Sequence, residues 1–177
     1  MKILLVSSYL PYPLFSGGNI RLYNIIRELS KKHALTLICE KRKYQTDKDV
    51  KQVGQFCKRI ITVPRKKQWT FTNIIKTGFS PYPFLMIGHT LPEMKNAISE
   101  QLRRDSFDLI HVETFYVMQN LPQVHLPVVL AEQNIEYMVY QRFAKQAHFF
   151  LKPLLYLDIL KMKYWEEKFW RTVAKLI

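Results

Sequence analysis

Short apolar segments alternate with amphipathic segments along the chain. Runs rich in Val, Ile and Leu, each with the length and composition of a buried parallel strand, occupy residues 2–8, 34–40, 59–64, 107–112 and 126–132. Apolar residues recur at helical spacing within residues 20–29, 47–58 and 91–105. This regular alternation predicts an α/β fold, a Rossmann-like parallel sheet with helices on both faces and right-handed crossovers.

The last third of the chain predicts two more helices and the start of a strand. Residues 135–145 form the first helix, and apolar residues at near-helical spacing from residue 149 onward predict a long second one. Pro153 either begins or kinks that helix. Residues 174–177 resemble the opening of another buried strand. We therefore expect residues 1–177 to be a single N-terminal domain of a longer protein.

Residues 65–89 interrupt the alternation. The segment is basic, then aromatic, and is broken by Pro81 and Pro83. It carries more large apolar side chains than a surface loop needs. One interpretation is a helix and loop packed on the sheet. The other is an exposed apolar patch beside a basic one, which would suit a membrane-bound acceptor.

The net charge of the chain is +13, from 27 Lys and Arg against 14 Asp and Glu. Basic residues cluster at 41–43, 65–67 and 103–104, and again at Lys161 with Lys163. A nucleic acid, an anionic membrane surface or a phosphorylated substrate would suit these clusters, as would a merely solvated basic surface. We expect no nucleic-acid partner, because the aromatic residues lie mostly at core spacing and no recognised binding module is present.

Other classes of protein are disfavoured by what the sequence lacks. No segment reaches the ~18 uncharged apolar residues of a membrane span. Cys39 and Cys57 form no disulfide or metal framework and are typical of reduced thiols in a cytoplasmic protein. No N-terminal signal segment is apparent. The histidines lack the spacing of metal ligands, so no metal is expected.

A glycine pair connects the first strand to the first helix. Residues 9–16 form a loop fixed by Pro11 and Pro13, and Gly17-Gly18 lead directly into the helix. Glycine lets the backbone approach a ligand closely, and the free N–H groups at the start of a helix attract anions. The pair therefore either binds a phosphate or simply makes the turn.

Polar residues follow the fourth and fifth strands. In an open parallel sheet, ligands bind at the carboxyl ends of the strands. Mixed carboxylate, amide and aromatic groups of the kind that bind polyols follow these strands at His111, Glu113, Tyr116, Glu132, Gln133, Asn134 and Glu136. His111 is either a base or a hydrogen-bonded core histidine. Glu113 either lines the site or caps the next helix.

Several stretches resemble retaining glycosyltransferases of the GT-B architecture. The opening KILLVSSYLPYP, the SGG sequence followed by Arg21, and the RLYNIIREL helix are similar to the start of that family. FDLIHVETFY is similar to its fourth strand, and VVLAEQNIEYMVYQRF to its segment written acidic-His-Asn-hydrophobic-Glu. The resemblance covers this chain and the N-terminal half of such an enzyme.

The resemblance implies a two-domain enzyme that transfers a sugar from a nucleotide-sugar, with retention and without a metal, to a cell-surface polysaccharide or lipid-linked acceptor. This half would bind the acceptor at the inner face of the cell membrane, and an absent C-terminal half would hold the nucleotide-sugar. Gly17, Gly18 and Arg21 would face the donor diphosphate. The cleft would be lined by His111, Glu113, Tyr116, Gln133, Asn134 and Glu136.

One position departs from the family pattern. Gln133 stands where many relatives carry a histidine that contacts the donor sugar. Glutamine can hydrogen-bond a hydroxyl but cannot titrate near neutral pH. This difference is compatible with an altered sugar specificity or with an inactive relative. The alternative hypothesis is a non-catalytic basic module that docks on an anionic membrane or another polyanion.

Overall fold

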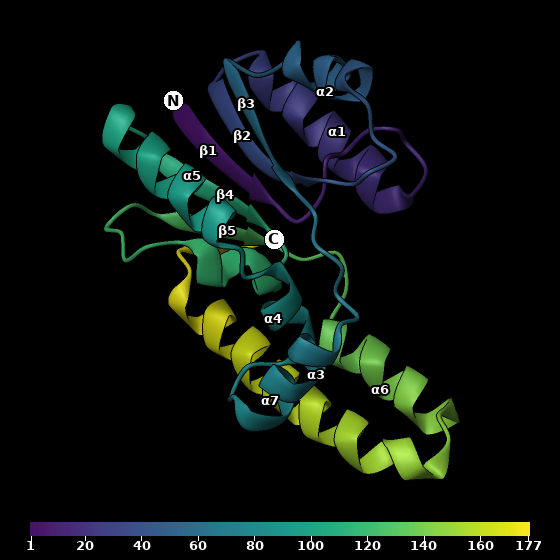
Figure 1. Ribbon diagram of the computed structural model, residues 1–177. Helices are drawn as coiled ribbons and strands as arrows, with labels where there is room; N and C mark the ends of the chain where they lie inside the picture. The colour runs from purple at the N-terminus through teal and green to yellow at the C-terminus, as the bar shows by residue number, and fades with distance from the viewer.

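Six parallel strands form one sheet in the computed structural model, which describes residues 1–177 (Figure 1). The strands are β1 (Lys2–Ser7), β2 (Ala34–Lys41), β3 (Arg59–Pro64), β4 (Leu109–Glu113), β5 (Val128–Ala131) and β6 (Lys175–Leu176). Their order is β3-β2-β1-β4-β5-β6, and every neighbouring pair is parallel. The Rossmann-like α/β fold is therefore confirmed. The strand order reverses between β1 and β4, where such folds bind ligands.

Seven α-helices and two short 3₁₀ helices connect the strands. The α-helices are α1 (Gly17–Ser30), α2 (Asp47–Gly54), α3 (Phe71–Phe79), α4 (Phe84–His89), α5 (Pro92–Arg104), α6 (Glu136–Gln146) and α7 (Lys152–Thr172). The 3₁₀ helices are η1 (Phe115–Asn120) and η2 (Phe149–Leu151). No helix has both the length and the hydrophobicity that crossing a bilayer requires.

The two faces of the sheet carry separate hydrophobic cores because side chains alternate along each strand. Ile3 and Leu5 of β1 pack with Leu22 and Ile26 of α1, in a core that also holds Val53 of α2. The opposite face of the sheet packs against α4, α5, η1 and α7. Its buried side chains include Leu4, Val6, Met86, Met94, Ile98, Phe115 and Met162. Figure 1 shows α1 and α2 on one side of the sheet and α5 and α7 on the other.

Most predicted boundaries lie within two residues of the observed ones, but α2 ends earlier than residue 58. Its last residue is Gly54, because the Lys58 N–H donates to the Leu35 carbonyl at 2.8 Å and thereby joins the sheet. Residues 55–57 connect the end of α2 to β3. Pro153 lies in the first turn of α7, where a proline is tolerated, so it begins the helix and does not kink it.

Residues 65–89 divide between the two interpretations of this segment. The helix α4 is buried and contributes Leu85 and Met86 to the core. The helix α3 has no buried residue, and the side chains of Phe71 and Phe79 are 78% and 92% exposed. The second part of the segment therefore packs on the sheet, and the first part presents apolar groups to solvent.

Candidate functional site

A buried carboxylate lies at the centre of the strand ends. Glu113 ends β4, is 1% exposed, and accepts hydrogen bonds from Arg21 Nη1 at 3.1 Å to each carboxylate oxygen. His111 Nε2 lies 3.2 Å from Glu113 Oε1, and Gln133 Nε2 donates to Glu113 Oε2 at 3.5 Å. Three elements far apart in sequence therefore meet at one carboxylate, and Arg21 neutralises its charge.

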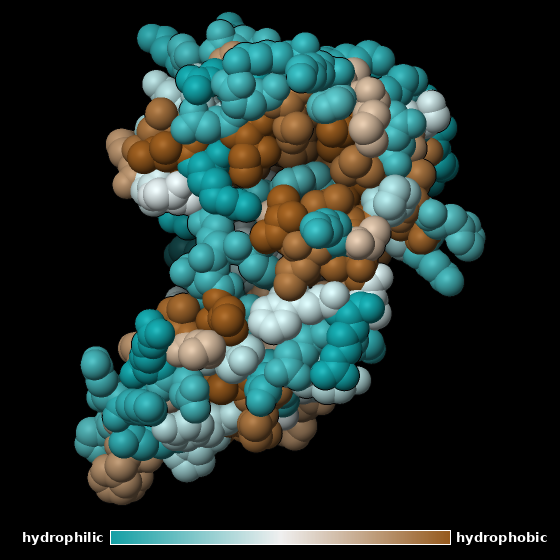
Figure 2. Space-filling view, turned by 180° about the vertical axis from the view of Figure 1, so that it is seen from behind, coloured by the Kyte–Doolittle hydropathy of each residue, from teal (hydrophilic) through white to brown (hydrophobic).

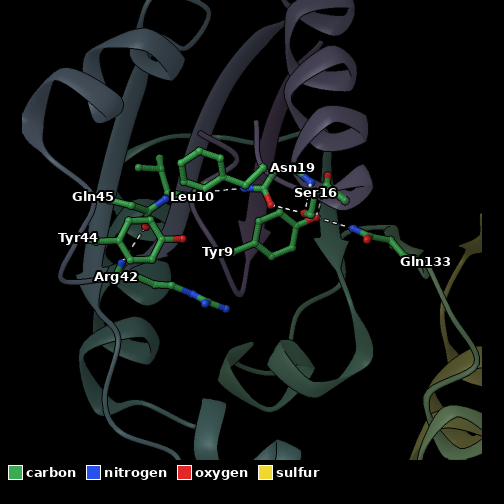
Figure 3. A pocket seen from close by; sticks show the side chains of 10 residues that line it. Tyr9, Leu10, Ser16, Asn19, Arg42, Tyr44, Gln45 and Gln133 are labelled. Carbon is green, nitrogen blue, oxygen red and sulfur yellow. Dashed lines mark hydrogen bonds between the residues drawn. The ribbon is translucent and has the colours of Figure 1, made fainter. Parts of the chain in front are cut away.

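Tyr9 connects this carboxylate to the first helix. Its hydroxyl accepts a hydrogen bond from Gln133 Nε2 and donates to the Gly18 carbonyl at 3.3 Å (Figure 3). Burial raises the pKa of Tyr9, and the nearby charge of Glu113 raises it further. The phenol therefore stays protonated and acts as a fixed hydrogen-bond donor.

The glycine pair is used for space and not for an unusual backbone conformation, since no glycine has a positive φ. A Cβ on Gly18 would lie 2.3 Å from Gln133 Oε1, whereas a Cβ on Gly17 would meet nothing within 4 Å. Gly18 therefore lets the Gln133 amide lie directly on the start of α1. The predicted turn is present. Of its two glycines, only Gly18 has a neighbouring side chain that leaves no room for a Cβ.

The start of α1 is partly capped. Ser16 Oγ accepts the Asn19 N–H at 3.2 Å, which satisfies one of the free donors of the first turn. Gly17 and Gly18 occupy the first two helical positions, whose N–H groups have no acceptor within a helix. The N–H groups of Gly17 and Gly18 are therefore the donors that could bind an anion at this helix start.

A cavity of about 310 Å³ lies beside this helix start, between the loop after β1 and the loop after β2. Its lining residues are Tyr9, Leu10, Phe15, Ser16, Gly18, Asn19, Arg42, Tyr44, Gln45 and Gln133 (Figure 3). None of them is acidic. Gln45 holds the second loop in place: its Nε2 donates to the Leu10 carbonyl at 3.0 Å, and its Oε1 accepts the Arg42 N–H at 2.8 Å.

Some hydrogen-bonding groups of the cavity remain available for a ligand. Within the chain, the Arg42 guanidinium, the Tyr44 hydroxyl and Gln133 Oε1 have no hydrogen-bond partner, and Arg42 has no ion-pair partner. The rings of Phe15 and Tyr44 lie 6.4 Å apart, both exposed. The cavity thus offers one free cation, hydroxyl and amide groups, and apolar ring faces, which suit a hydroxylated ligand with a neutral or negative charge.

The residues predicted for the site divide into three groups. Gly18 and Gln133 line the cavity, and Arg21, His111 and Glu113 lie behind them. Gly17 does not line it, and Asn134 is exposed beside it. Tyr116 and Glu136 do not line it either. The Tyr116 ring lies 4.6 Å from that of His89 and its hydroxyl accepts a hydrogen bond from Ser8 Oγ at 3.4 Å, while Glu136 begins α6. His111 is 5% exposed and hydrogen-bonded, which is the core role considered for it.

The sequence did not predict that the loop after β2 lines the cavity. Arg42 belongs to a basic cluster that was identified from the sequence, but nothing in the pattern distinguishes Tyr44 and Gln45 from ordinary loop residues. Tyr9 begins the loop that was predicted to lie at the ligand-binding edge, but neither it nor Asn19, which follows the glycine pair, was singled out as a site residue. No three His, Cys, Asp or Glu side chains are arranged as metal ligands.

A second set of carboxylates lies at the end of β5. Glu132 Oε1 accepts the Phe115 N–H at 2.9 Å, while its Oε2 is buried without a partner. Burial raises the pKa of Glu132 to about 9, with a further contribution from the charge of Glu166. Glu166 caps α6 by accepting the N–H groups of Glu136 at 2.8 Å and Tyr137 at 3.2 Å. Glu132 is therefore protonated at neutral pH.

The link between β4 and η1 is strained. Thr114 has a φ of 75°, in the left-handed region that a β-branched residue rarely adopts, and its Oγ1 is buried without a hydrogen-bond partner. The Thr114 N–H still donates to the Ala131 carbonyl at 2.9 Å. Beyond this turn, the Tyr116 ring packs on His89 and its hydroxyl accepts a hydrogen bond from Ser8 Oγ at 3.4 Å.

Removing the Arg21 side chain is expected to destabilise the fold. The Arg21→Leu variant leaves the buried Glu113 carboxylate without its guanidinium partner, and we expect a loss of about 2–3 kcal/mol in the free energy of unfolding. Urea denaturation measures this change. The double variant Arg21→Leu with Glu113→Gln should recover most of the loss, and equal instability of the single and double variants would contradict the ion-pair explanation.

Comparisons with known proteins concern the fold only. No protein-family model and no curated protein matches this sequence. Among solved structures, the C-terminal domain of a hydrogenase from Pyrococcus furiosus, residues 78–226 of that protein, aligns with a TM-score of 0.48 at 15% sequence identity. The alignment covers 73% of this chain and 89% of that domain. A likeness at this level says nothing about function.

Proposed function

We propose that this chain is the acceptor-side domain of a retaining glycosyltransferase, which transfers a sugar from a nucleotide-sugar to a polysaccharide or lipid-linked acceptor. One observation carries the proposal. The cavity at the carboxyl ends of the strands combines the start of a helix, a free Arg42 and a set of uncharged polar groups, and no carboxylate lines it. The sequence resemblance of residues 1–38 to the GT-B family supports the same assignment.

The cavity groups suit a sugar ring. Phe15 and Tyr44 offer aromatic faces to the apolar C–H face of a sugar. The Tyr44 hydroxyl and Gln133 Oε1 are available to sugar hydroxyl groups, since nothing else in the chain uses them. Because Gln133 cannot titrate, its role here is to orient a hydroxyl and not to transfer a proton.

The donor diphosphate would lie against the start of α1. Gly17 and Gly18 are the first two residues of α1, and amide donors at a helix start stabilise the charge that develops on a departing diphosphate. Arg21 Nη1 is held by both carboxylate oxygens of Glu113, so the contribution of Arg21 is to fix that carboxylate. A second Rossmann-like half would supply the nucleotide contacts.

The two glycines provide a matched pair of variants. In Gly18→Ala, the new Cβ forces the Gln133 amide away from Tyr9 and Glu113, so we expect donor or acceptor binding to weaken roughly tenfold, or about 1.4 kcal/mol. Gly17→Ala keeps the backbone N–H and meets open space, so binding should be unchanged. Calorimetric titration of nucleotide-sugars and acceptor glycans into the full-length gene product measures both.

Two results of this titration would count against the proposal. Equal weakening in both variants would show that the glycines act on the helix and not through Gln133. Wild-type affinity in Gly18→Ala would remove this edge of the sheet as the binding site.

A further inference from the structure

The helices α6 and α7 form an antiparallel hairpin that projects from the sheet (Figure 1). At its end, which we call the hairpin tip (residues 142–157), large apolar side chains are exposed: Phe143, Phe149, Phe150, Leu151, Leu154 and Leu157. Phe150 is 71% exposed and Leu154 is 68% exposed. Apolar groups gathered at the end of a projecting element are too many for an unpartnered surface.

Every charged side chain of the hairpin tip is basic. Arg142, Lys145 and Lys152 alternate with the exposed apolar groups, and residues 142–157 contain no Asp or Glu. None of these three cations forms an ion pair in the chain. The next acidic residue, Asp158, accepts the Phe84 N–H at 2.8 Å and is thus held against α4. Figure 2 shows hydrophobic and hydrophilic surface side by side on this projecting lobe.

The helix α3 extends the same combination of apolar and basic groups. Lys161 Nζ on α7 donates to the carbonyls of Thr77 at 2.6 Å and Ser80 at 2.8 Å, which holds the end of α3 on the hairpin. Phe71 and Phe79 are exposed on α3. All charged residues between positions 65 and 80 are basic, and two of them, Lys67 and Lys76, form no ion pair, whereas Arg65 pairs with Glu40 and Lys66 with Glu93.

The charge of this surface favours an anionic occupant. A second copy of the chain would bring the same unpaired cations together, and their repulsion opposes self-association. An anionic bilayer attracts them, because its lipid phosphates accept the lysine and arginine contacts while its interfacial region takes up phenyl and leucyl side chains. We propose that the hairpin tip docks the protein on a membrane that contains anionic lipid, with α3 as a second contact. This inference does not rest on glycosyl transfer.

Flotation with lipid vesicles tests the proposal. The wild-type protein should bind vesicles that contain phosphatidylglycerol, should bind pure phosphatidylcholine vesicles far less, and should dissociate as salt rises. The variant carrying Phe149→Ser, Phe150→Ser and Leu154→Ser should bind about tenfold less, as should Lys145→Glu with Lys152→Glu. Circular dichroism of each variant verifies that the fold is retained.

Arg103→Glu provides the matched control, since Arg103 is exposed at the end of α5, distant from the hairpin tip (Figure 1). At moderate salt its effect on vesicle binding should be negligible. Wild-type flotation in the tip variants, or equal binding to both kinds of vesicle, would overturn the proposal. So would a dimer in analytical ultracentrifugation that the tip variants abolish, because the occupant would then be a second copy. None of these assays needs a nucleotide-sugar, so their failure is separate from failure of the proposed function.

Discussion

Replacing Glu132 with glutamine should stabilise the protein at pH 8 by about 4 kcal/mol. Burial and the charge of Glu166 raise the pKa of Glu132 from 4.5 to about 9, so ionisation is far less favourable in the folded state than in the unfolded state. Glutamine keeps the contact that matters, because its amide oxygen accepts the Phe115 N–H at 2.9 Å as the carboxyl oxygen does. The substitution also removes a carboxyl group that ionises more readily in the unfolded chain, and whose ionisation therefore favours unfolding once the pH exceeds 4.5.

The sign of the pH dependence follows from the raised pKa. The contribution of Glu132 to stability should be most favourable below about pH 4.5, where Glu132 is protonated in both states, and should become less favourable as the pH rises from 4.5 toward 9. Glu166, whose pKa burial raises to about 7, adds a loss of the same sign between 4.5 and 7. The stabilisation by Glu132→Gln should therefore be absent at pH 4 and large at pH 8.

Denaturant unfolding at a series of pH values measures this effect. The control is Glu100→Gln, since Glu100 is a surface residue in an exposed pair with Arg104 and should change stability by less than about 0.5 kcal/mol at any pH. A Glu132→Gln variant with the same pH profile as the wild type would show that Glu132 is ionised in the fold.

Replacing Arg65 with methionine should destabilise the protein by about 3–5 kcal/mol. Arg65 Nη1 lies 2.8 Å from Glu40 Oε2, and Glu40 is fully buried at the end of β2. His89 Nδ1 lies 2.7 Å from the other carboxylate oxygen, but burial lowers the pKa of His89, so the imidazole donates a hydrogen bond without carrying a charge. Loss of Arg65 therefore leaves a buried carboxylate without a cation.

The neighbouring Lys66 serves as the control for Arg65. Lys66 pairs with Glu93 at 2.6 Å on the surface, and Lys66→Met should cost no more than about 0.5 kcal/mol. The double variant Arg65→Met with Glu40→Gln should be more stable than Arg65→Met alone, because the carboxylate itself is gone. Thermal unfolding of the three variants distinguishes these outcomes, and a small effect of Arg65→Met would contradict the assigned ion pair.

The central strands β1, β2 and β4 were predictable because nearly all of their side chains are buried, on both faces of the sheet. The run at residues 59–64 matches β3 at both ends, and the apolar helix positions Leu22, Ile26, Met94 and Ile98 are all fully buried. The early end of α2 was not predictable, since it is set by a hydrogen bond between Lys58 and Leu35 in a neighbouring strand. Local pattern carries no information about such a contact.

Only those residues of the site that directly follow the carboxyl ends of strands were predictable from the sequence. The order of the elements brought Gly18, Glu113 and Gln133 together, as ligand-binding edges of parallel sheets do. The pairing of Arg21 with Glu113 joins residues that are 92 positions apart, and a single sequence does not contain it. Tyr116 contacts Ser8 at the same edge of the sheet but does not line the cavity, and the residue types do not reveal the positive φ of Thr114 that precedes it.

The exposed helix α3 shows a related limit of the sequence pattern. Phe71, Ile74 and Phe79 follow helical spacing, which ordinarily indicates a face packed on a core. All three are exposed, so the same periodicity that identifies the helix does not say what covers its apolar side. The basic residues around α3 are the observation that leads us to propose a membrane contact for this stripe.

The assay that tests the proposed activity most directly is sugar transfer by the full-length gene product. A panel of UDP-, GDP- and other nucleotide-sugars is incubated with lipid-linked and polysaccharide acceptors, and release of nucleoside diphosphate is followed with Arg42→Ala beside the wild type. We predict release that depends on the acceptor and that falls about tenfold in Arg42→Ala, which removes the free cation of the cavity. No binding and no release across the panel would contradict the assignment as a glycosyltransferase domain.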